Sequence, residues 1–227
     1  MTFKKVLSAI MAGAMVLSMG LTAFAAATPS GVELEGEEGY DIEVGTATQV
    51  ATIKVKVPET VGFVVNPYRL DVKNEELGIT DTSKSQIVSP IQKIENLGAF
   101  KISVGGTIYA VENSEEAKLV ENVTASGTDL AKEASINFNY VAGEGTETTL
   151  STPNTTKLFE AKAEAGKALT AVEIDAKDTA SGKPVYLFQF DGSAQSNPST
   201  PWTEGDTFGA TISFTFTAVA NDAPAGP

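Results

Sequence analysis

Apolar residues at every second position are the sequence feature that most constrains the fold of this chain. The clearest run covers residues 208–218, where phenylalanine, isoleucine and alanine alternate with glycine, threonine and serine. A period of two is typical of a β-strand with one face in the core and the other in water. The same alternation recurs in residues 51–57, 100–104 and 134–140. The pattern therefore predicts an all-β protein.

Other segments are expected to add strands of a different kind. Residues 61–65 and 185–190 carry apolar residues on both faces, so we expect both segments to lie deep in the core. Residues 157–163 and 168–176 are expected to be the two strands of a hairpin, because turn-forming residues lie between them. Together with the alternating runs, these segments favour antiparallel pairing between neighbouring strands.

Segments with helical character are scarce. Residues 113–122 form the best candidate, with Ser114 as the N-cap. Ala117, Leu119 and Val120 would then be its buried side. A parallel α/β sheet needs a connection of about a dozen residues, usually a helix, between strands, and the sequence offers no such helix. The predicted fold is therefore an all-β antiparallel sandwich, jelly-roll-like, with about ten strands and at most one or two short helices.

The first residues have the pattern of a secretory signal peptide. Lys4 and Lys5 precede the apolar run 6–21 and the small-residue site Ala23-Phe24-Ala25. The run is shorter than the ~20 residues of a spanning helix, so we expect cleavage after Ala25 and a secreted product, extracellular or associated with the cell surface. The predicted organisation is a signal peptide at 1–25, a flexible acidic N-terminal arm at 26–45, a single β-sandwich domain at 46–220 and a disordered C-terminal tail at 221–227.

Composition excludes several classes of function. Cleavage would remove Lys4 and Lys5, leaving 14 basic against 29 acidic residues and a net charge of −15. Such a surface repels nucleic acid and anionic membranes. The chain has no Cys and no His. Disulfides, zinc sites, Ser-His-Asp triads and Cys-His dyads are therefore all excluded. We expect no cofactor, no nucleic-acid partner and no membrane span after cleavage.

Carboxylates are abundant but show no catalytic spacing. Oxygen ligands suit Ca²⁺, and the expected arm holds a dense acidic cluster: Glu35, Glu37, Glu38, Asp41 and Glu43. Its spacing matches no EF-hand loop, so a solvated acidic arm is the simpler interpretation. Glu115 with Glu116, or Asp191 with Asp206, are the candidates for a glycosidase-like acid/base pair. Nothing in the spacing singles out either pair, so we predict no catalytic, cofactor-binding or metal site residues.

Aromatic residues offer one further possibility, a platform for sugars. Aromatic faces bind the apolar faces of sugars, and the candidates are Trp202, Tyr186, Tyr140 and Phe190. Tyr140 and Phe190 lie in regular strand patterns, where packing in the core is the simpler role. Trp202 lies in a loop rich in proline and serine, where it is expected to cap one end of the sandwich.

Part of the sequence resembles secreted surface proteins of Gram-positive bacteria. The stretch GDTFGATISFTFTAVAN, with its Gly205-Asp206 and Phe214, is similar to the closing strand pattern of TasA/camelysin-like matrix fibre proteins. The segment from Ile94 to Val104 resembles WxL-type surface proteins, but the chain has no paired Trp-x-Leu motif. The resemblance covers a small part of the chain. It implies a role in a fibre or at the cell wall, by analogy rather than by chemistry.

Three classes of function remain open. A structural subunit of an extracellular matrix or filament would self-assemble by strand donation, with the extended segment 41–57 completing a neighbour's open sheet. A surface adhesin or carbohydrate-binding module would bind cell-wall or host glycans through Trp202 and its loop. A hydrolase with two carboxylates ranks last. The sequence therefore predicts a secreted, non-catalytic structural protein.

Overall fold

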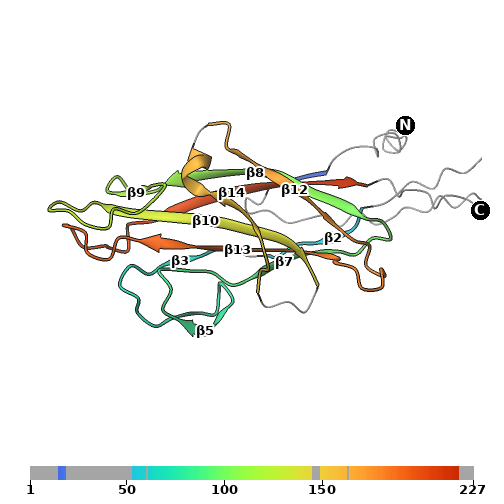
Figure 1. Ribbon diagram of the computed structural model, residues 1–227, viewed down its shortest axis with the longest axis horizontal. Helices are drawn as coiled ribbons and strands as arrows, with labels where there is room; N and C mark the ends of the chain where they lie inside the picture. Colours follow the sequence, from blue (N-terminus) through green and yellow to red (C-terminus); the bar gives the residue numbers. More distant parts are fainter. Residues whose placement is uncertain (1–14, 19–52, 60, 145–148, 163, 220–227) are drawn as a thin grey trace, which may run out of the picture.

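The computed structural model describes residues 15–18, 53–59, 61–144, 149–162 and 164–219. Within these ranges the chain is almost entirely β-structure, with antiparallel sheets packed against each other (Figure 1). The predicted all-β sandwich is confirmed. The described residues form fourteen strands rather than about ten, because several strands are only two or three residues long.

Two sheets form the layers of the sandwich. The four-stranded sheet has the order β1 (Met15–Ser18), β14 (Phe208–Ala218), β8 (Ile102–Glu112) and β12 (Lys167–Ile174). The other main sheet has the order β11 (Asn154–Lys157), β10 (Lys132–Gly143), β13 (Val185–Ala194), β7 (Gln92–Asn96) and β2 (Val55–Lys56). Its sixth strand, β9 (Ala117–Leu119), pairs with β10 in parallel. All other pairings in the two layers are antiparallel.

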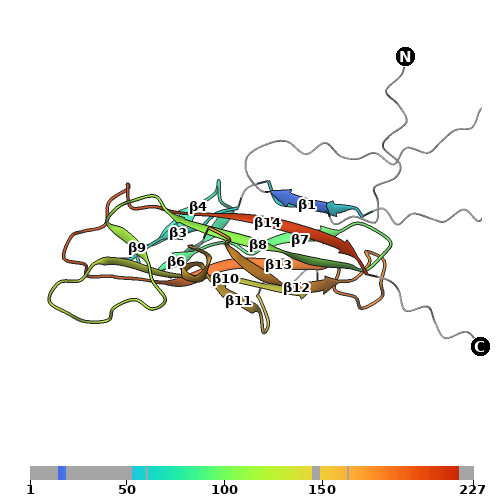
Figure 2. The same ribbon diagram turned by 90° about the horizontal axis from the view of Figure 1, so that it is seen from above.

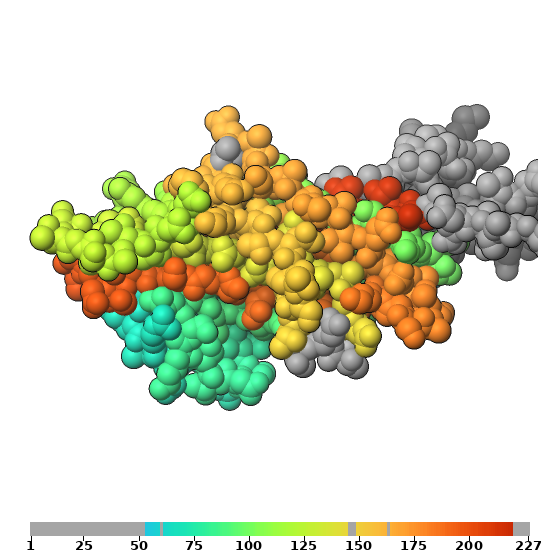
Figure 3. Space-filling model, in the orientation of Figure 1, coloured from blue at the N-terminus to red at the C-terminus, as the bar shows by residue number. Residues whose placement is uncertain are grey.

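A smaller lobe stands out from the body of the sandwich on the side of the six-stranded sheet (Figure 3). It contains two short pairs, β3 (Val64–Val65) with β6 (Ile87–Val88), and β4 (Val72–Asn74) with β5 (Ile79–Ser83). The one helix in the described ranges is the 3-10 segment η1 (Leu158–Lys162). No helix among the described residues is both long and apolar enough to cross a membrane.

The core between the layers is dominated by aromatic rings from three strands. The largest fully buried aromatic side chains come in pairs from β10, β13 and β14: Phe138 and Tyr140, Tyr186 and Phe188, Phe214 and Phe216. The ring centroid of Phe214 lies 5.7 Å from that of Tyr186 and 5.8 Å from that of Phe188, so side chains of the two sheets pack directly against each other. Such aromatic contacts add to the free energy that burial alone provides.

The strand expected at residues 208–218 is confirmed with the bounds that the alternation predicts. β14 pairs with β8 over its whole length in one unbroken register, from Phe208 opposite Glu112 to Ala218 opposite Ile102. Its buried residues, Ile212, Phe214 and Phe216, are every second one. Opposite Phe214 lies Gly106, whose φ is +154°. A Cβ at Gly106 would collide with the carbonyl oxygen of Ser213, so glycine is required here.

The helix predicted at residues 113–122 is wrong. Ser114 does accept hydrogen bonds from the N–H groups of Glu116 and Ala117, as a cap would. The chain then continues as β9, in which Ala117 and Leu119 are buried and the residue between them is exposed. Pairing with β10 satisfies the backbone and buries both apolar side chains, so the tertiary contact outweighs a weak local preference.

The hairpin predicted from 157–163 and 168–176 is also wrong. Residues 158–162 form the helix η1 instead, because Leu158 and Ala161 are buried three positions apart. The second strand exists as β12, but its partner is β8. The pattern of residues 185–190 is confirmed as a central strand, since β13 lies between β10 and β7.

Two expectations about the first part of the domain need correction. Residues 61–65 are half-buried rather than deep, since their short strand belongs to the lobe. The strand expected at 51–57 is reduced to β2, although Ile53 and Val57 also pack against the core. Residues 51–52, the arm at 26–45 and the tail at 221–227 lie outside the described residues.

Replacing Phe214 with alanine tests the aromatic core. Phe214→Ala removes the ring that joins the two sheets, and we expect a loss of about 3–5 kcal/mol in the free energy of unfolding. Thr211→Ala, on the exposed face of the same strand, is the matched control and should change stability by less than about 0.5 kcal/mol. Denaturant unfolding of both variants measures the difference. Equal losses would contradict the assignment of Phe214 to the core.

Candidate functional site

The outer edge of β14 is the most unusual surface of the fold. On one side β14 pairs with β8 along eleven residues. On the other side its partner among the described residues is β1, which covers Ser213–Phe216. Met15 lies opposite Phe216 and Leu17 opposite Phe214 in that pairing. β1 falls inside the segment 1–25 that the sequence marks as a signal peptide, so the predicted cleavage would remove this strand.

The hydrogen-bond pattern shows which backbone groups point toward this edge. The N–H of Asn113 donates to the carbonyl of Thr207, and the N–H of Val219 donates to the carbonyl of Lys101. These two bonds flank the unbroken β14–β8 register. Because successive residues of a strand point their N–H and C=O groups to opposite sides, odd-numbered residues of β14 face β8. The even-numbered residues, 208 to 218, therefore point their N–H and C=O groups to the outer edge.

β14 carries none of the features that normally protect a sheet edge. Residues 208–218 include no charged residue and no proline, and the β14–β8 ladder contains no bulge. Natural edges are kept from pairing by short length, charge, proline or bulges. The opposite edge strand, β12, has Lys167, Glu173 and a register shift. In the six-stranded sheet, the edge strands β11 and β2 have only four and two residues.

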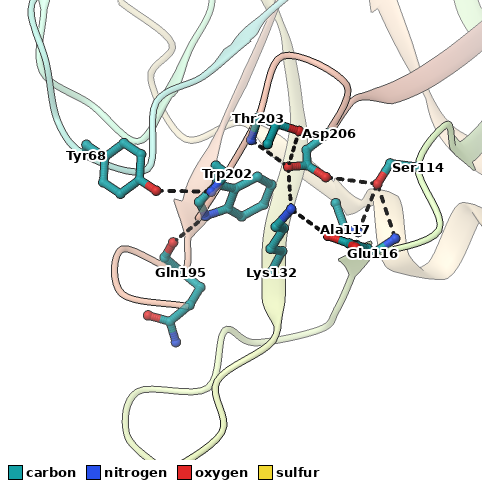
Figure 4. Close-up of polar contacts among 9 residues, drawn as sticks. All are labelled: Tyr68, Ser114, Glu116, Ala117, Lys132, Gln195, Trp202, Thr203 and Asp206. Atoms are coloured by element: carbon teal, nitrogen blue, oxygen red, sulfur yellow. Dashed lines mark hydrogen bonds and ion pairs between the residues drawn. The ribbon is translucent and has the colours of Figure 1, made fainter. Parts of the chain in front are cut away.

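The loop that leads into β14 is fixed by a buried ion pair (Figure 4). Lys132 Nζ lies 2.8 Å from Asp206 Oδ2 and 2.7 Å from Glu116 Oε2. The side chains of Lys132 and Asp206 are only 3% and 4% exposed. Asp206 also accepts hydrogen bonds from the Ser114 hydroxyl at 3.1 Å and from the Thr203 N–H at 2.7 Å. The cluster ties the start of β10, the approach to β9 and the start of β14 together.

The charges in this cluster are stabilised by their partners. Burial by itself would raise the pKa of Asp206, but hydrogen bonds from Lys132, Thr203 and Ser114 lower this pKa to about 2. Hydrogen bonds to Asp206 and Glu116 raise the pKa of Lys132 above its ordinary value. Asp206 is therefore held as a carboxylate, with its oxygens already engaged, and has no free proton to donate in catalysis.

Of the two carboxylate pairs considered from sequence, the structure does not bring Asp191 and Asp206 together. Asp191 accepts a hydrogen bond from Asn137 at 2.9 Å, whereas Asp206 binds Lys132, five residues away on the same strand. These two partners lie roughly 17 Å apart along β10, and each carboxylate is bound by its own partner rather than by the other. Glu116 is engaged with Lys132. No group of three or more acidic residues in the described ranges is arranged to hold a metal ion. The cluster Glu35 to Glu43 lies outside those ranges.

Trp202 lies at the end of the sandwich and is engaged internally. Its indole N–H donates to the carbonyl of Gln195 at 2.7 Å, and its backbone N–H donates to the Tyr68 hydroxyl at 3.1 Å. Its ring meets Phe208 edge-on, with centroids 6.3 Å apart. The ring is half-buried. This is the capping role expected from the sequence.

The other three aromatic candidates for a sugar platform are core residues. Tyr140, Tyr186 and Phe190 are 1%, 1% and 3% exposed, so none presents a face to a ligand. The prediction of core packing for Tyr140 and Phe190 is confirmed. A groove of about 800 Å³ does lie between the lobe and the six-stranded sheet. Its Gln189 amide already donates to the carbonyl of Ser89 at 2.7 Å, and its one ring, Phe190, is buried.

Comparison with known proteins finds no matching family model, no significant match among curated proteins and none among solved structures. The resemblance to TasA/camelysin-like or WxL-type proteins therefore stays a prediction. The features that sequence reasoning missed are the Lys132–Asp206 pair and the position of β14 at an edge. No sequence signal pointed to that edge, because edge strands usually carry charge or proline and residues 208–218 carry neither.

The Lys132–Asp206 ion pair predicts how the free energy of unfolding depends on pH. Because the folded pKa of Asp206, about 2, lies below the unfolded value near 3.8, its carboxylate stabilises the fold above pH ~4. This contribution is lost as the pH falls from about 4 toward 2. The Asp206→Asn variant has no carboxylate at this position, so its free energy of unfolding should be lower than that of the unchanged chain at pH 6. This difference should shrink as the pH falls toward 2. Urea unfolding from pH 6 to pH 2 measures it, with exposed Glu115→Gln as control. A pH-independent difference would contradict the assignment.

Proposed function

We propose that this protein is a secreted, non-catalytic structural subunit of a cell-surface or extracellular matrix or filament. In this proposal copies of the chain associate by β-strand addition at the outer edge of β14. The residues before β2 provide the strand, as the predicted strand donation requires. The product would be an assembly in which each sandwich is completed by a strand from a neighbour.

The observation that carries the proposal is the unprotected edge of β14. Without β1, no other strand in the described part of the chain pairs with the outer edge of β14, to which six residues point their N–H and C=O groups, and the strand offers no charge, proline or bulge to discourage pairing. An edge of this length is a template for another strand. Main-chain hydrogen bonds then supply affinity, and alternate side chains supply specificity.

The rest of the molecule supports a passive scaffold. The described carboxylates with shifted pKa, Glu112, Glu160 and Asp206, are each paired with a lysine. The signal-like N-terminus supports export, and the strongly acidic surface favours solubility before assembly. The edge strands other than β14 are short, charged or bulged, so association would be directed to one place on the subunit.

Proline substitution on β14 tests the proposal with the chain that begins at Ala26. Ala210 and Ala218 point their N–H groups outward, so Ala210→Pro/Ala218→Pro removes two donors from the edge without removing any from the β8 ladder. Two lost hydrogen bonds amount to about 2 kcal/mol, or roughly thirtyfold in the association constant. Light scattering and electron microscopy over a concentration series measure the assembly.

The serine double variant Ala210→Ser/Ala218→Ser is the matched control, because it keeps both N–H groups. It should assemble like the unchanged chain. Thermal unfolding of all three chains verifies that the sandwich is intact. A chain from Ala26 that stays monomeric at every concentration would overturn the proposed function. Equal assembly of the proline and serine variants would also overturn it.

A further inference from the structure

We propose that the strand added to β14 is the segment Tyr40–Val44 of a second copy of the chain. This inference rests on the proposed function and names its donor. In the proposed register, antiparallel like that of β1, Tyr40 lies opposite Phe216, Ile42 opposite Phe214 and Val44 opposite Ile212. The flanking residues continue the ladder, with Glu38 opposite Ala218 and Thr46 opposite Ala210. The segment is acidic at the two positions between, Asp41 and Glu43.

The space beside β14 admits one strand and not a second sandwich. The six-stranded sheet extends past β14 to β2, and the views from the side and from above place β1 over β2 at the same edge (Figures 1 and 2). Removing β1 leaves residues 53–57, which include β2 and the half-buried Ile53, Val55 and Val57, projecting beyond β14. If a second copy paired its own β14 with this edge, its six-stranded sheet, which projects in the same way, would collide with β2. A single extended strand meets no such obstacle.

The position beside β14 also sets the pattern that a donor must have. Directly opposite residues of an antiparallel pair lie on the same face. The donor must therefore be apolar opposite Ile212, Phe214 and Phe216, which are buried, and tolerant of water opposite Ser213 and Thr215. β1 satisfies the same rule, with methionine and leucine opposite the two phenylalanines.

Only a limited part of the chain is free to supply this donor. Segment 41–57 as a whole does not qualify, because β2 pairs with β7 and the carbonyl of Lys54 accepts a hydrogen bond from the Leu97 N–H at 2.8 Å. We therefore place the donor in residues 26–52, because the segment 220–227 at the other end of the chain contains two prolines. Within them Tyr40, Ile42 and Val44 form the alternation of three apolar residues. Residues 31–34 offer only two, Val32 and Leu34.

The lack of charge in β14 and the length of the chain between the donor and Ile53 agree with this assignment. β14 carries no charge, so Asp41 and Glu43 would meet no acidic residue across the pairing. Like charges directly opposite one another would weaken it. The six residues 47–52 separate the end of the paired ladder from Ile53 and span up to roughly 20 Å when extended. This length lets the segment leave its own subunit and lie on the edge of a neighbour.

Engineered cysteines test the donor and the register, because the natural chain contains no Cys. Asp41→Cys with Thr215→Cys, in the chain from Ala26, places the two thiols at directly opposite positions. Thr215 points its N–H toward β8, so this is a non-hydrogen-bonded pair across the new ladder, with Cα atoms about 4.5 Å apart. That distance suits a disulfide. We expect mild oxidation of the assembled protein to give a ladder of covalent multimers that collapses to monomer on reduction.

Two control pairs share one cysteine with the test pair. Asp41→Cys with Thr211→Cys moves one thiol four residues along the same face, about 13 Å away, beyond disulfide reach. Glu33→Cys with Thr215→Cys probes the competing segment 31–34. Both should give little or no multimer ladder under the same conditions.

The outcomes of the cross-linking experiment distinguish the identity of the donor segment from the proposed function itself. A ladder from the Asp41–Thr215 pair, absent from both controls, supports the proposal. A ladder from the Glu33 pair instead, or assembled fibres with no ladder from any pair, overturns the donor while the proposed function stands. A disulfide that forms within single chains shows that the segment closes its own subunit and overturns donation between copies. A chain that never assembles overturns the proposed function itself.

Discussion

The backbone of β14 needs hydrogen-bond partners on both of its sides, and the rest of the structure depends on how this requirement is met. One side is satisfied by β8 along the full strand. Among the residues that the structure describes, the other side is paired over Ser213–Phe216, by a strand inside the predicted signal peptide. Main-chain groups at a long, uncharged edge remain available to any chain that can pair with them. An exported form of this protein would therefore carry an unfilled place in its sheet.

The surrounding structure keeps this edge straight and in place. Phe214 and Phe216 anchor the inner face of β14 in the aromatic core. Lys132 and Asp206 fix the loop that enters the strand, and Trp202 covers the end of the sandwich beside it. These contacts leave the outward groups of the strand fixed in direction. A donor strand would thus bind to a template that is already ordered, which lowers the entropic cost of association.

Sequence patterning predicted where the strands lie better than it predicted which strands pair with one another. The alternation at 208–218 gave the bounds of β14, because a strand with one buried face leaves a period of two in the sequence. At 113–122 the local pattern favoured a helix, and pairing of Ala117–Leu119 with β10 outweighed it. That β14 lies at an edge could not be predicted, since alternation is the same for edge and central strands. The Lys132–Asp206 pair joins residues 74 positions apart, which no local pattern reveals.

Residue-resolved amide hydrogen exchange on β14 shows whether a strand is added at its outer edge. It compares the chain that begins at Ala26 before and after assembly. The odd-numbered amides point to β8 and should be protected in both states. The even-numbered amides from 208 to 218 point outward, so those at Ile212, Phe214 and Phe216 should exchange readily in the monomer and become protected on assembly. Assembled protein whose outward amides exchange as readily as in the monomer would contradict strand addition at this edge.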